Sequence, residues 1–189
     1  LEAELSRLPL EPVDLGAFVR GMARALPLVA PWSDRLRLEV AAPADGVAVA
    51  MAERSRLERV VGNLLANAAS FSPDGGTVRL TVSVDPMRVE LRVEDEGPGV
   101  APQLADAIFE RFYSERPEAE SYGRHSGLGL SIVRAIVEAF EGEVFVTGRP
   151  DGASGACFIV RLPRLGAPGA RPRAGQAATG APAGSRPSP

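Results

Sequence analysis

The chain has 189 residues, 45% of them hydrophobic, which is enough for one globular domain with a core of its own. All 21 basic residues are arginine, and 24 acidic residues give a net charge of −3, which argues against a nucleic-acid-binding core. A single cysteine, Cys157, excludes an internal disulfide, and no apolar run approaches the roughly 20 residues of a membrane span.

The N-terminal part of the sequence predicts helices and short strands. Residues 1–8 carry leucines at helical spacing and precede two prolines, as at the end of a longer helix. Asp14 is placed to cap a second helix. Residues 36–40 alternate as a strand does, and residues 47–50 form another short apolar run. We expect residues 1–12 to be a linker or the end of an upstream helical hairpin.

The middle of the sequence predicts a helix followed by a hairpin. Ser55, with Glu58 three positions later, matches a capping box before a helix with one apolar face. Residues 72–76, Ser-Pro-Asp-Gly-Gly, form a turn by composition. Residues 77–84 and 88–94 alternate apolar and polar side chains, which predicts two antiparallel strands.

The C-terminal part predicts one more helix and a closing hairpin. Residues 126–139 are amphipathic at helical spacing, and residues 143–147 and 156–162 alternate as strands do. Residues 164–189 hold four arginines and no acid among Ala, Gly, Pro and Ser, a composition typical of disorder. Mixed helices and hairpins predict helices on one face of a mixed or antiparallel sheet, within one domain over residues 13–163.

Two polar segments stand out from this pattern. Asn63 and Asn67 are four residues apart, so they share one helix face, and an amide oxygen is a suitable ligand for Mg²⁺. Asp95 directly follows a strand and precedes Gly97 and Gly99. A carboxylate at a strand end can accept a hydrogen bond from an exocyclic amine, and glycines let a ligand approach the backbone. Each segment alone is also compatible with an ordinary polar helix face or acidic turn.

Two further segments frame the predicted C-terminal helix. Residues 108–113 place two phenylalanines inside a long polar stretch, which is compatible with a functional lid or with a short packed helix. We expect residues 101–126 to form a lid. Gly127 and Gly129 open the helix, where backbone N–H groups at the positive helix end can bind an anion. His125, the only histidine, is expected to be an ordinary solvated or hydrogen-bonding loop residue.

In this order and at this spacing, the four segments resemble the N, G1, F and G2 boxes of the GHKL superfamily and, within it, of sensor histidine kinases. The matching positions are Asn63 to Asn67 with Ala68, Asp95 with Gly97 and Gly99, Phe109 to Phe112, and Gly127 to Leu130. Residues 70–73, 114–117 and 125–131 also resemble the ChvG/ExoS-type kinases. The resemblance covers about residues 10–163. It implies a Bergerat-type α/β sandwich, a mixed sheet of about five strands with three helices on one face.

The resemblance implies ATP and Mg²⁺ as ligands. The catalytic residues would be Asn63, Asn67 and Arg111, with Asn67 as the metal ligand. The residues expected to hold the nucleotide are Asn67, Phe71, Asp95, Gly97, Gly99, Phe112, Ser126, Gly127, Leu128 and Gly129. Ser70 stands where many such kinases have a Lys or Arg, which leaves Arg111, Arg116 or Arg124 to contact the phosphates.

The activity implied is transfer of the ATP γ-phosphate to a histidine on a hairpin domain outside this chain. His125 is rejected as the acceptor because it lies within the G2 box. The hairpin domain would dimerise upstream in the parent kinase, and a response regulator would receive the phosphoryl group. We expect this chain to be monomeric, without a nucleic-acid partner, and to be the cytoplasmic portion of a protein anchored in the bacterial inner membrane.

Three alternatives stay open. GHKL ATPases have a glutamate as general base where this chain has Asn63; an amide cannot abstract a proton, so Asn63 favours transfer over hydrolysis. An anti-sigma-type serine kinase shares the boxes, but the helix-like residues 1–8 favour attachment to an upstream hairpin. A degenerate nucleotide-binding signalling module is the third alternative, and the presence of all four boxes argues against it.

Overall fold

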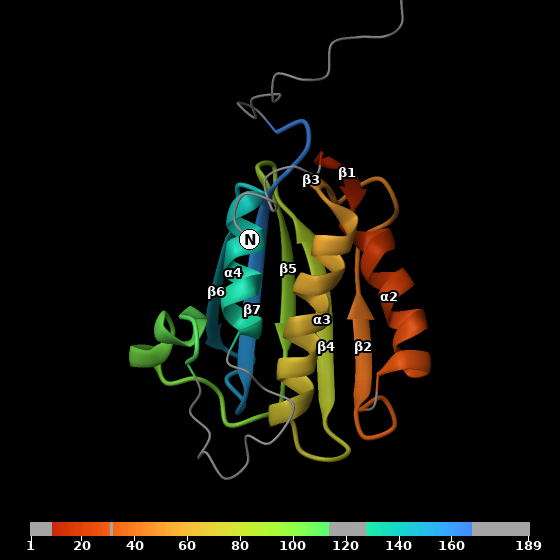
Figure 1. The fold of residues 1–189 in the computed structure, drawn as a ribbon. Coiled ribbons are helices and arrows are strands. Elements are labelled where there is room, and N and C mark those ends of the chain that lie inside the picture. The colour runs from red at the N-terminus through yellow and green to blue at the C-terminus, as the bar shows by residue number, and fades with distance from the viewer. Residues whose placement is uncertain (1–8, 31, 114–127, 168–189) are drawn as a thin grey trace, which may run out of the picture.

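The computed structural model describes residues 9–30, 32–113 and 128–167. Five strands form one sheet in the order β2-β4-β5-β7-β6 (Figure 1). Their bounds are β2 (Arg37–Ala41), β4 (Thr77–Val84), β5 (Arg88–Glu94), β6 (Glu143–Gly148) and β7 (Ala156–Pro163). The β2–β4 pair is parallel, and the other three pairs are antiparallel. The predicted mixed sheet of about five strands is therefore confirmed.

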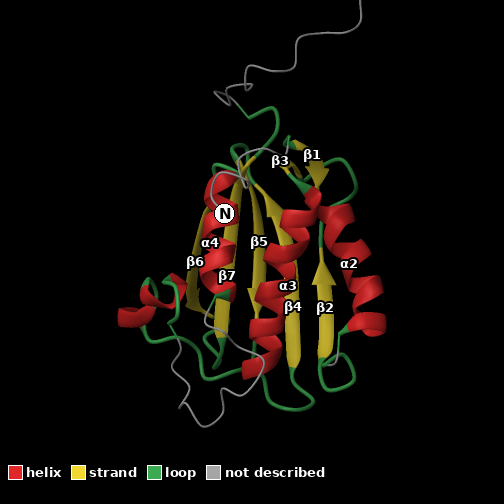
Figure 2. Cartoon of the chain, viewed as in Figure 1, coloured by secondary structure: helices red, strands yellow, loops and turns green. Residues whose placement is uncertain are grey.

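Helices α2 (Leu15–Val29), α3 (Arg54–Phe71) and α4 (Gly129–Ala139) lie over one face of this sheet (Figure 2). Two short 3-10 helices, η1 (Pro102–Leu104) and η2 (Ala107–Phe109), follow β5 and add to the three helices expected. The predicted α/β sandwich is thus confirmed. None of the helices within the described residues is long and apolar enough to cross a membrane.

The core lies between the sheet and the helices. Along β4 and β5 the residues alternate between buried and partly exposed, as expected for strands with one covered face. The buried apolar residues of α3 are Leu57, Val60, Val61, Leu64, Leu65, Ala68 and Ala69. Full burial of one Leu or Val stabilises the fold by about 1.5–3 kcal/mol, so this stripe fixes how α3 lies on the sheet. Asn63 and Asn67 are half-buried beside it.

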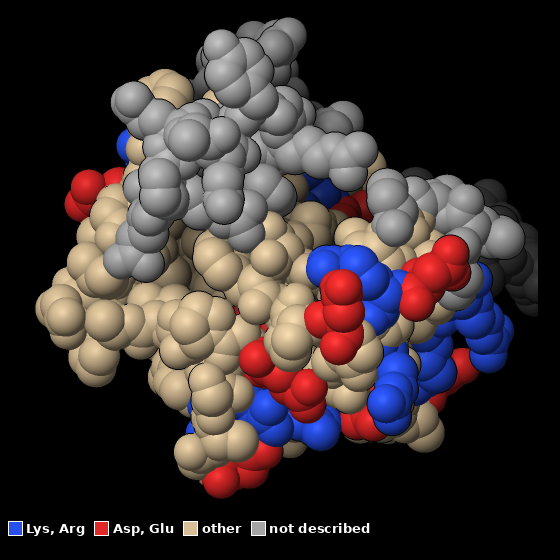
Figure 3. Space-filling view, turned by 90° about the horizontal axis from the view of Figure 1, so that it is seen from below, with Lys and Arg blue, Asp and Glu red and all other residues tan. Residues whose placement is uncertain are grey.

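The face of the sheet that the helices leave uncovered carries a network of ion pairs. Arg79 bonds Glu39 of the neighbouring strand at 3.0 Å, and Arg161 bonds Glu90 at 2.6 Å. The Arg161 guanidinium also lies 4.7 Å from the centre of the Phe145 ring. Figure 3, which views the domain from one end, shows acidic and basic groups intermixed on the described surface. Such pairs contribute little stability individually, but they keep an open sheet face hydrated.

The start of α3 differs from the sequence prediction. The helix begins at Arg54, and its N-cap is Glu53, whose carboxylate accepts the N–H groups of Ser55 and Arg56, each at 2.9 Å. The predicted capping box of Ser55 and Glu58 is wrong. The Ser55 hydroxyl donates to the same Glu53 carboxylate at 2.9 Å, so a longer acidic side chain caps the helix from two residues upstream.

A second, two-stranded sheet lies next to the main one, formed by β1 (Glu11–Asp14) and β3 (Val49–Ala52) in antiparallel pairing. The β1 strand was not predicted, because Pro12 interrupts it; proline is tolerated at a sheet edge, where its missing N–H leaves no ladder bond unmade. Arg164 bridges to Ala50 on the other side of β3. The predicted cap at Asp14 is confirmed: its carboxylate accepts the N–H groups of Gly16 and Ala17 in the first turn of α2.

The predicted helix over residues 1–8 and most of the predicted tail, residues 168–189, lie outside the described residues. At the C-terminal end of the described chain, the Leu165 N–H donates to the Val49 carbonyl at 2.8 Å, and Ala167 is buried. The chain therefore stays in contact with the domain for a few residues after β7.

Candidate functional site

The two asparagines of α3 differ in what they contact. The Asn63 Nδ2 donates to the carbonyl oxygen of Gly129 at 3.3 Å, which ties α3 to the first residue of α4. Asn67 lies one turn further along the same face and is half-buried. Its side chain makes no hydrogen bond to the part of the chain that the structure describes.

Asp95 lies at the end of β5 and is only 2% exposed. One carboxylate oxygen, Oδ1, accepts the N–H of Gly97 at 2.9 Å and that of Ala156 at 3.1 Å. The Asp95 N–H donates back to the Ala156 carbonyl at 3.0 Å. The other oxygen, Oδ2, accepts no hydrogen bond from the described residues. One oxygen is therefore fixed by backbone donors, and the second is left for a donor on a ligand.

Burial raises the pKa of the Asp95 carboxyl above its ordinary value. The N–H groups of Ala156 and Gly97 and the positive charge of Arg149 act in the opposite direction and support the ionised form. A buried carboxylate whose ionised form is opposed by burial and supported by nearby N–H groups is a candidate functional group, because perturbed pKa values cluster at functional sites.

Glycines shape the loop that follows Asp95. A Cβ on Gly97 would lie 2.9 Å from the Phe71 carbonyl oxygen and 3.0 Å from Asp95 Oδ1, so the loop and the end of α3 approach more closely than any side chain allows. Gly99 has φ +82°, and a Cβ there would lie 3.0 Å from the Gly155 oxygen. The structure thus brings Phe71, at the end of α3, against the predicted glycine loop.

The first part of the predicted lid is packed. Phe109, in η2, is buried and meets Phe158 edge to face, with ring centres 6.3 Å apart. The Arg134 guanidinium lies 4.7 Å from the Phe109 ring centre. Phe112, by contrast, is 76% exposed and has φ +65°. Residues 114–126 of the predicted lid lie outside the described residues.

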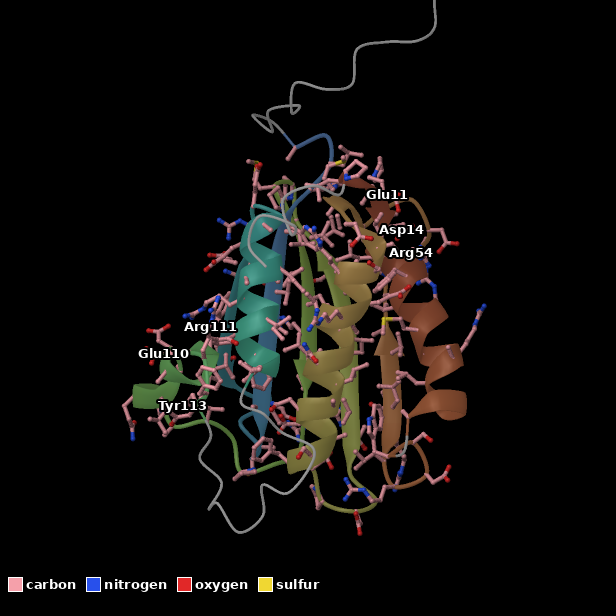
Figure 4. The ribbon with its side chains drawn as sticks, viewed as in Figure 1. Glu11, Asp14, Arg54, Glu110, Arg111 and Tyr113 are labelled. Carbon is pink, nitrogen blue, oxygen red and sulfur yellow. The ribbon has the colours of Figure 1, made fainter. Side chains whose placement is uncertain are left out.

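Arg111 is placed apart from the asparagines in this structure. Figure 4 shows it with Glu110 and Tyr113 on the segment after η2, on the far side of α4 from α3. Its side chain is exposed. The structure therefore joins Asn63 to the start of α4 and Phe71 to the glycine loop, but it does not place Arg111 beside α3.

Among the described residues, the first turn of α4 has no side-chain cap. The helix begins at Gly129, with Leu128 as its N-cap, and no side chain of the described residues bonds the N–H groups of this turn. The sequence predicted that this helix starts at Ser126, three residues before Gly129. Ser126 and Gly127 themselves lie outside the described residues. An uncapped helix N-terminus carries a partial positive charge and unpaired donors, which favour an anion.

Sequence reasoning missed the turn between β6 and β7 as part of the site. Ser154 Oγ donates to the Gly97 carbonyl at 2.8 Å, and Ala156 supplies one of the two donors on Asp95. A signal was present in Ser154-Gly155, a small-residue pair just before a strand, where Gly155 has φ +137°. These contacts join residues 57 and 61 positions apart, which no local pattern reveals.

The described residues form a mixed five-stranded sheet covered on one face, with a buried carboxylate at a strand end. Beside an asparagine-bearing helix lies the N-terminus of α4, which no described side chain caps. This is the α/β sandwich arrangement that the sequence predicted. Residues 52–166 match the family described as histidine kinase-, DNA gyrase B-, and HSP90-like ATPase. This match covers more than half of the chain, and the chain belongs to that family.

Its curated relatives are sensor proteins by name. The chain is 35% identical over 171 residues to the sensor protein ChvG of Agrobacterium fabrum, covering 86% of this chain and 29% of the relative. It is 37% identical over 155 residues to the sensor protein CreC of Escherichia coli, covering 82% and 31%. The chain thus spans less than a third of these relatives. The resemblance to ChvG-like sensor kinases is confirmed.

Solved structures of histidine kinases are also similar to this chain. The mycobacterial sensor histidine kinase MprB matches with a TM-score of 0.65 and 33% identity, over 82% of this chain and 97% of that chain. Full-length ShkA in complex with AMPPNP matches with a TM-score of 0.65 and 32% identity, over 85% and 33%. The catalytic domain of histidine kinase ThkA, at 22% identity and a TM-score of 0.68, shares the fold.

Proposed function

We propose that this domain binds ATP and transfers its γ-phosphate to a histidine on a hairpin domain outside this chain, as the catalytic domain of a two-component sensor histidine kinase. The observation that carries the proposal is the Asp95 carboxylate, with Oδ1 fixed by two backbone donors and Oδ2 unengaged by the described residues. The sensor-kinase relatives support it.

The base is recognised at the end of β5. Asp95 Oδ2 accepts the exocyclic amino group of adenine, and Gly97 and Gly99 leave the backbone open to the ring. Phe71, at the end of α3, borders this region and is 43% exposed, which leaves ring surface for an apolar contact with the base. Guanine presents a carbonyl where adenine presents the amine. Two acceptors would then face each other, so GTP is rejected.

The phosphates are held at the start of α4. The residues proposed for this role are Ser126, Gly127, Leu128 and Gly129, with Arg111 and Phe112 contributing from the preceding segment. The N-terminus of α4, which no described side chain caps, supplies backbone donors and a positive dipole end. Asn63 fixes this end by its bond to the Gly129 carbonyl.

The residues present fit a Mg²⁺ ion that is shared with the phosphates. The described residues contain no group of three or more His, Cys, Asp or Glu that could hold a metal by itself. The Asn67 amide, which makes no hydrogen bond to the described residues, would offer one oxygen ligand, so most of the shell would have to come from the nucleotide and water. When bound, Mg²⁺ neutralises charge on the phosphates.

The chain supplies positioning and electrostatics rather than a base. Asn63 occupies the place where a hydrolytic relative needs a carboxylate to activate water, and an amide cannot take the proton. The acceptor histidine brings its own nucleophilic nitrogen, so transfer needs only alignment of that nitrogen with the γ-phosphate. Asn63 therefore favours the kinase over a gyrase-like ATPase.

The wider assignments follow from the same proposal. The hairpin domain carries the acceptor histidine and the dimer contact, so this chain alone is monomeric. A response regulator takes the phosphoryl group from that histidine. The parent protein is anchored in the bacterial inner membrane, with this domain on the cytoplasmic side.

The test is to incubate the full chain with γ-labelled ATP and the hairpin domain of the parent kinase, produced separately. We expect acid-labile label on the hairpin, and none on a hairpin whose acceptor histidine is replaced. Release of free phosphate without transfer would instead identify an ATPase. Acid-stable label on serine would identify a serine kinase, and tight ATP binding without turnover would identify a signalling module.

A further inference from the structure

Arg149 lies in the turn between β6 and β7, and its side chain is only 6% exposed although the next five residues are exposed. A buried guanidinium requires partners. Its Nε donates to Asp151 Oδ1 at 3.1 Å, and Nη1 donates to the Ser154 carbonyl at 3.4 Å. Nη1 also lies 3.7 Å from Glu96 Oε1, on the loop after β5. Arg149 therefore joins the turn to the loop that carries Asp95.

The turn contacts this loop through Ser154, whose carbonyl accepts a hydrogen bond from Arg149, and through Ala156, which follows two residues later. Ser154 Oγ donates to the Gly97 carbonyl at 2.8 Å, and the Ala156 N–H donates to Asp95 Oδ1 at 3.1 Å. The fit is close, because a Cβ on Gly155 would lie 2.0 Å from the Asp95 carbonyl oxygen and 2.6 Å from Arg149 Cδ. A small displacement of the turn would therefore move a donor away from the Asp95 carboxylate.

Glu96 anchors the other side of the same loop. Its Oε2 accepts the Thr77 N–H at 3.0 Å, at the start of β4, and its own N–H donates to Ser72 Oγ at 3.4 Å, at the end of α3. The loop is thus fixed on the side of β4 and α3 by Glu96. On the side of the β6–β7 turn it depends on contacts that the Arg149 side chain organises.

We propose that Arg149 is a positioning residue for the ligand-binding carboxylate of Asp95, acting through Ser154 and Ala156 and not by touching the ligand. The proposal rests on the proposed function, since Asp95 is taken as the group that binds the base. Arg149 lies outside the four sequence boxes that match the family. Its interaction with Asp151 alone would make it an ordinary turn residue. The contacts of the turn with Gly97 and Asp95 extend its effect to the site.

The first experiment measures ATP affinity of the full chain by calorimetry at fixed Mg²⁺ for Arg149→Met, Arg149→Lys and Arg24→Met. Arg149→Met keeps an apolar stem and removes the donors, and we expect about a tenfold loss, the usual effect of removing a partner that orients a ligand-binding group. Arg149→Lys should recover part of it. Arg24→Met, on the exposed side of α2, is the matched control and should equal the wild type.

Amide hydrogen exchange distinguishes the positioning role from a general loss of stability, because only the positioning role changes the exchange rates near Asp95 selectively. In Arg149→Met the amides of Ala156 and Gly97 should exchange faster, while that of Leu64 in the core of α3 stays protected. If Arg149→Met does not fold, Ser154→Ala removes only the bond to the Gly97 carbonyl and should weaken ATP binding by about threefold. Wild-type affinity in Ser154→Ala, with unchanged exchange at Gly97, overturns the proposal.

A double-mutant cycle with Asp95→Asn separates this proposal from the function on which it rests. If Arg149 acts through Asp95, Arg149→Met should have no further effect on ATP affinity once Asp95 is asparagine. If Asp95→Asn alone leaves affinity unchanged, the base site itself is wrong. If Asp95→Asn weakens binding but Arg149→Met does not, or if the two losses multiply, the role of Arg149 is wrong and the proposed function stands.

Discussion

The loop after β5 and the first turn of α4 both contain glycine and both border the proposed nucleotide site, yet the protein holds them differently. In the loop, Asp95 Oδ1 is bonded to two backbone donors and Glu96 bonds the start of β4. The first turn of α4 has one cross-link in the described residues, from Asn63 to the Gly129 carbonyl, and no side-chain cap.

We infer that, in the proposed nucleotide site, the base end is formed in advance, whereas the phosphate end acquires partners from the ligand. Fixing the acceptor before binding reduces the entropy lost when adenine binds. Leaving helix donors uncapped keeps them for an anion, since a bonded cap would have to be displaced first. The two ends should therefore respond differently to substitution and to ligand.

The largest effect is expected where the loop is most crowded. Gly155→Ala places a Cβ 2.0 Å from the Asp95 carbonyl oxygen at a φ of +137°. We expect it to lower the free energy of unfolding by about 2–4 kcal/mol and ATP affinity by more than about 100-fold, measured by denaturation and calorimetry. Gly152→Ala, at φ +74° with no atom within 4 Å, is the control in the same turn. Equal behaviour of the two variants would show that the turn does not fix Asp95.

Next in size is the effect of Asn67→Ala at the phosphate end. Because its amide makes no bond to the described chain, removing it should leave thermal stability nearly unchanged. We expect a loss of about 10- to 100-fold in Mg-ATP affinity, the range for removing a metal-site partner, and a much smaller loss in EDTA. Equal losses with and without EDTA would contradict a metal role for Asn67.

The contrast between the two ends explains what the sequence could and could not predict. Alternation along residues 77–84 and helical spacing around Asn63 are local patterns, and both predictions agree with the structure. The residue spacing also singled out Asp95. The support of Asp95 by Ser154 and Arg149 depends on contacts across the sheet, which leave no periodic trace in the chain.

The errors in the cap of α3 and in the grouping of the two phenylalanines also come from contacts that the local sequence pattern does not show. Ser55 has the right residue type for a cap, but the side chain of Glu53 reaches the same N–H groups from outside the expected motif. Placing Phe109 and Phe112 in one box hides the fact that the first is buried and the second is exposed. Which of two similar residues packs inward is decided by tertiary contacts such as that with Phe158.

Amide hydrogen exchange should show the difference between the loop after β5 and the first turn of α4 directly, with an effect smaller than those of the substitutions above. In the free domain the amides of Gly97 and Ala156 should already be protected by Asp95. On addition of Mg-ATP, amides of residues 128–131 should slow by about tenfold, because their donors gain phosphate partners. ADP should protect less. Similar slowing at both ends would contradict a preformed base site, and protection over residues 101–126 would test the predicted lid in the same experiment.

The smallest effect is on stability of the free domain. Burial raises the pKa of Asp95 in the folded state, so the folded domain holds this proton more strongly than the unfolded chain and stability falls as pH rises through that pKa. Asp95→Asn keeps the shape without the charge. At neutral pH we expect an unchanged Tm or a rise of up to about 3 °C, and loss of this pH dependence. A clear fall in Tm would mean that the ionised form stabilises the domain.

ATP affinity of Asp95→Asn, set beside the exposed control Asp34→Asn, tests the base site most directly. Calorimetry of the full chain should show that Asp95→Asn weakens ATP and ADP alike by about 10- to 150-fold, the equivalent of one hydrogen bond to a charged group. Asp34→Asn should bind as the wild type does. ATP affinity in Asp95→Asn equal to that of the wild type would contradict the assignment of this carboxylate to the adenine amino group.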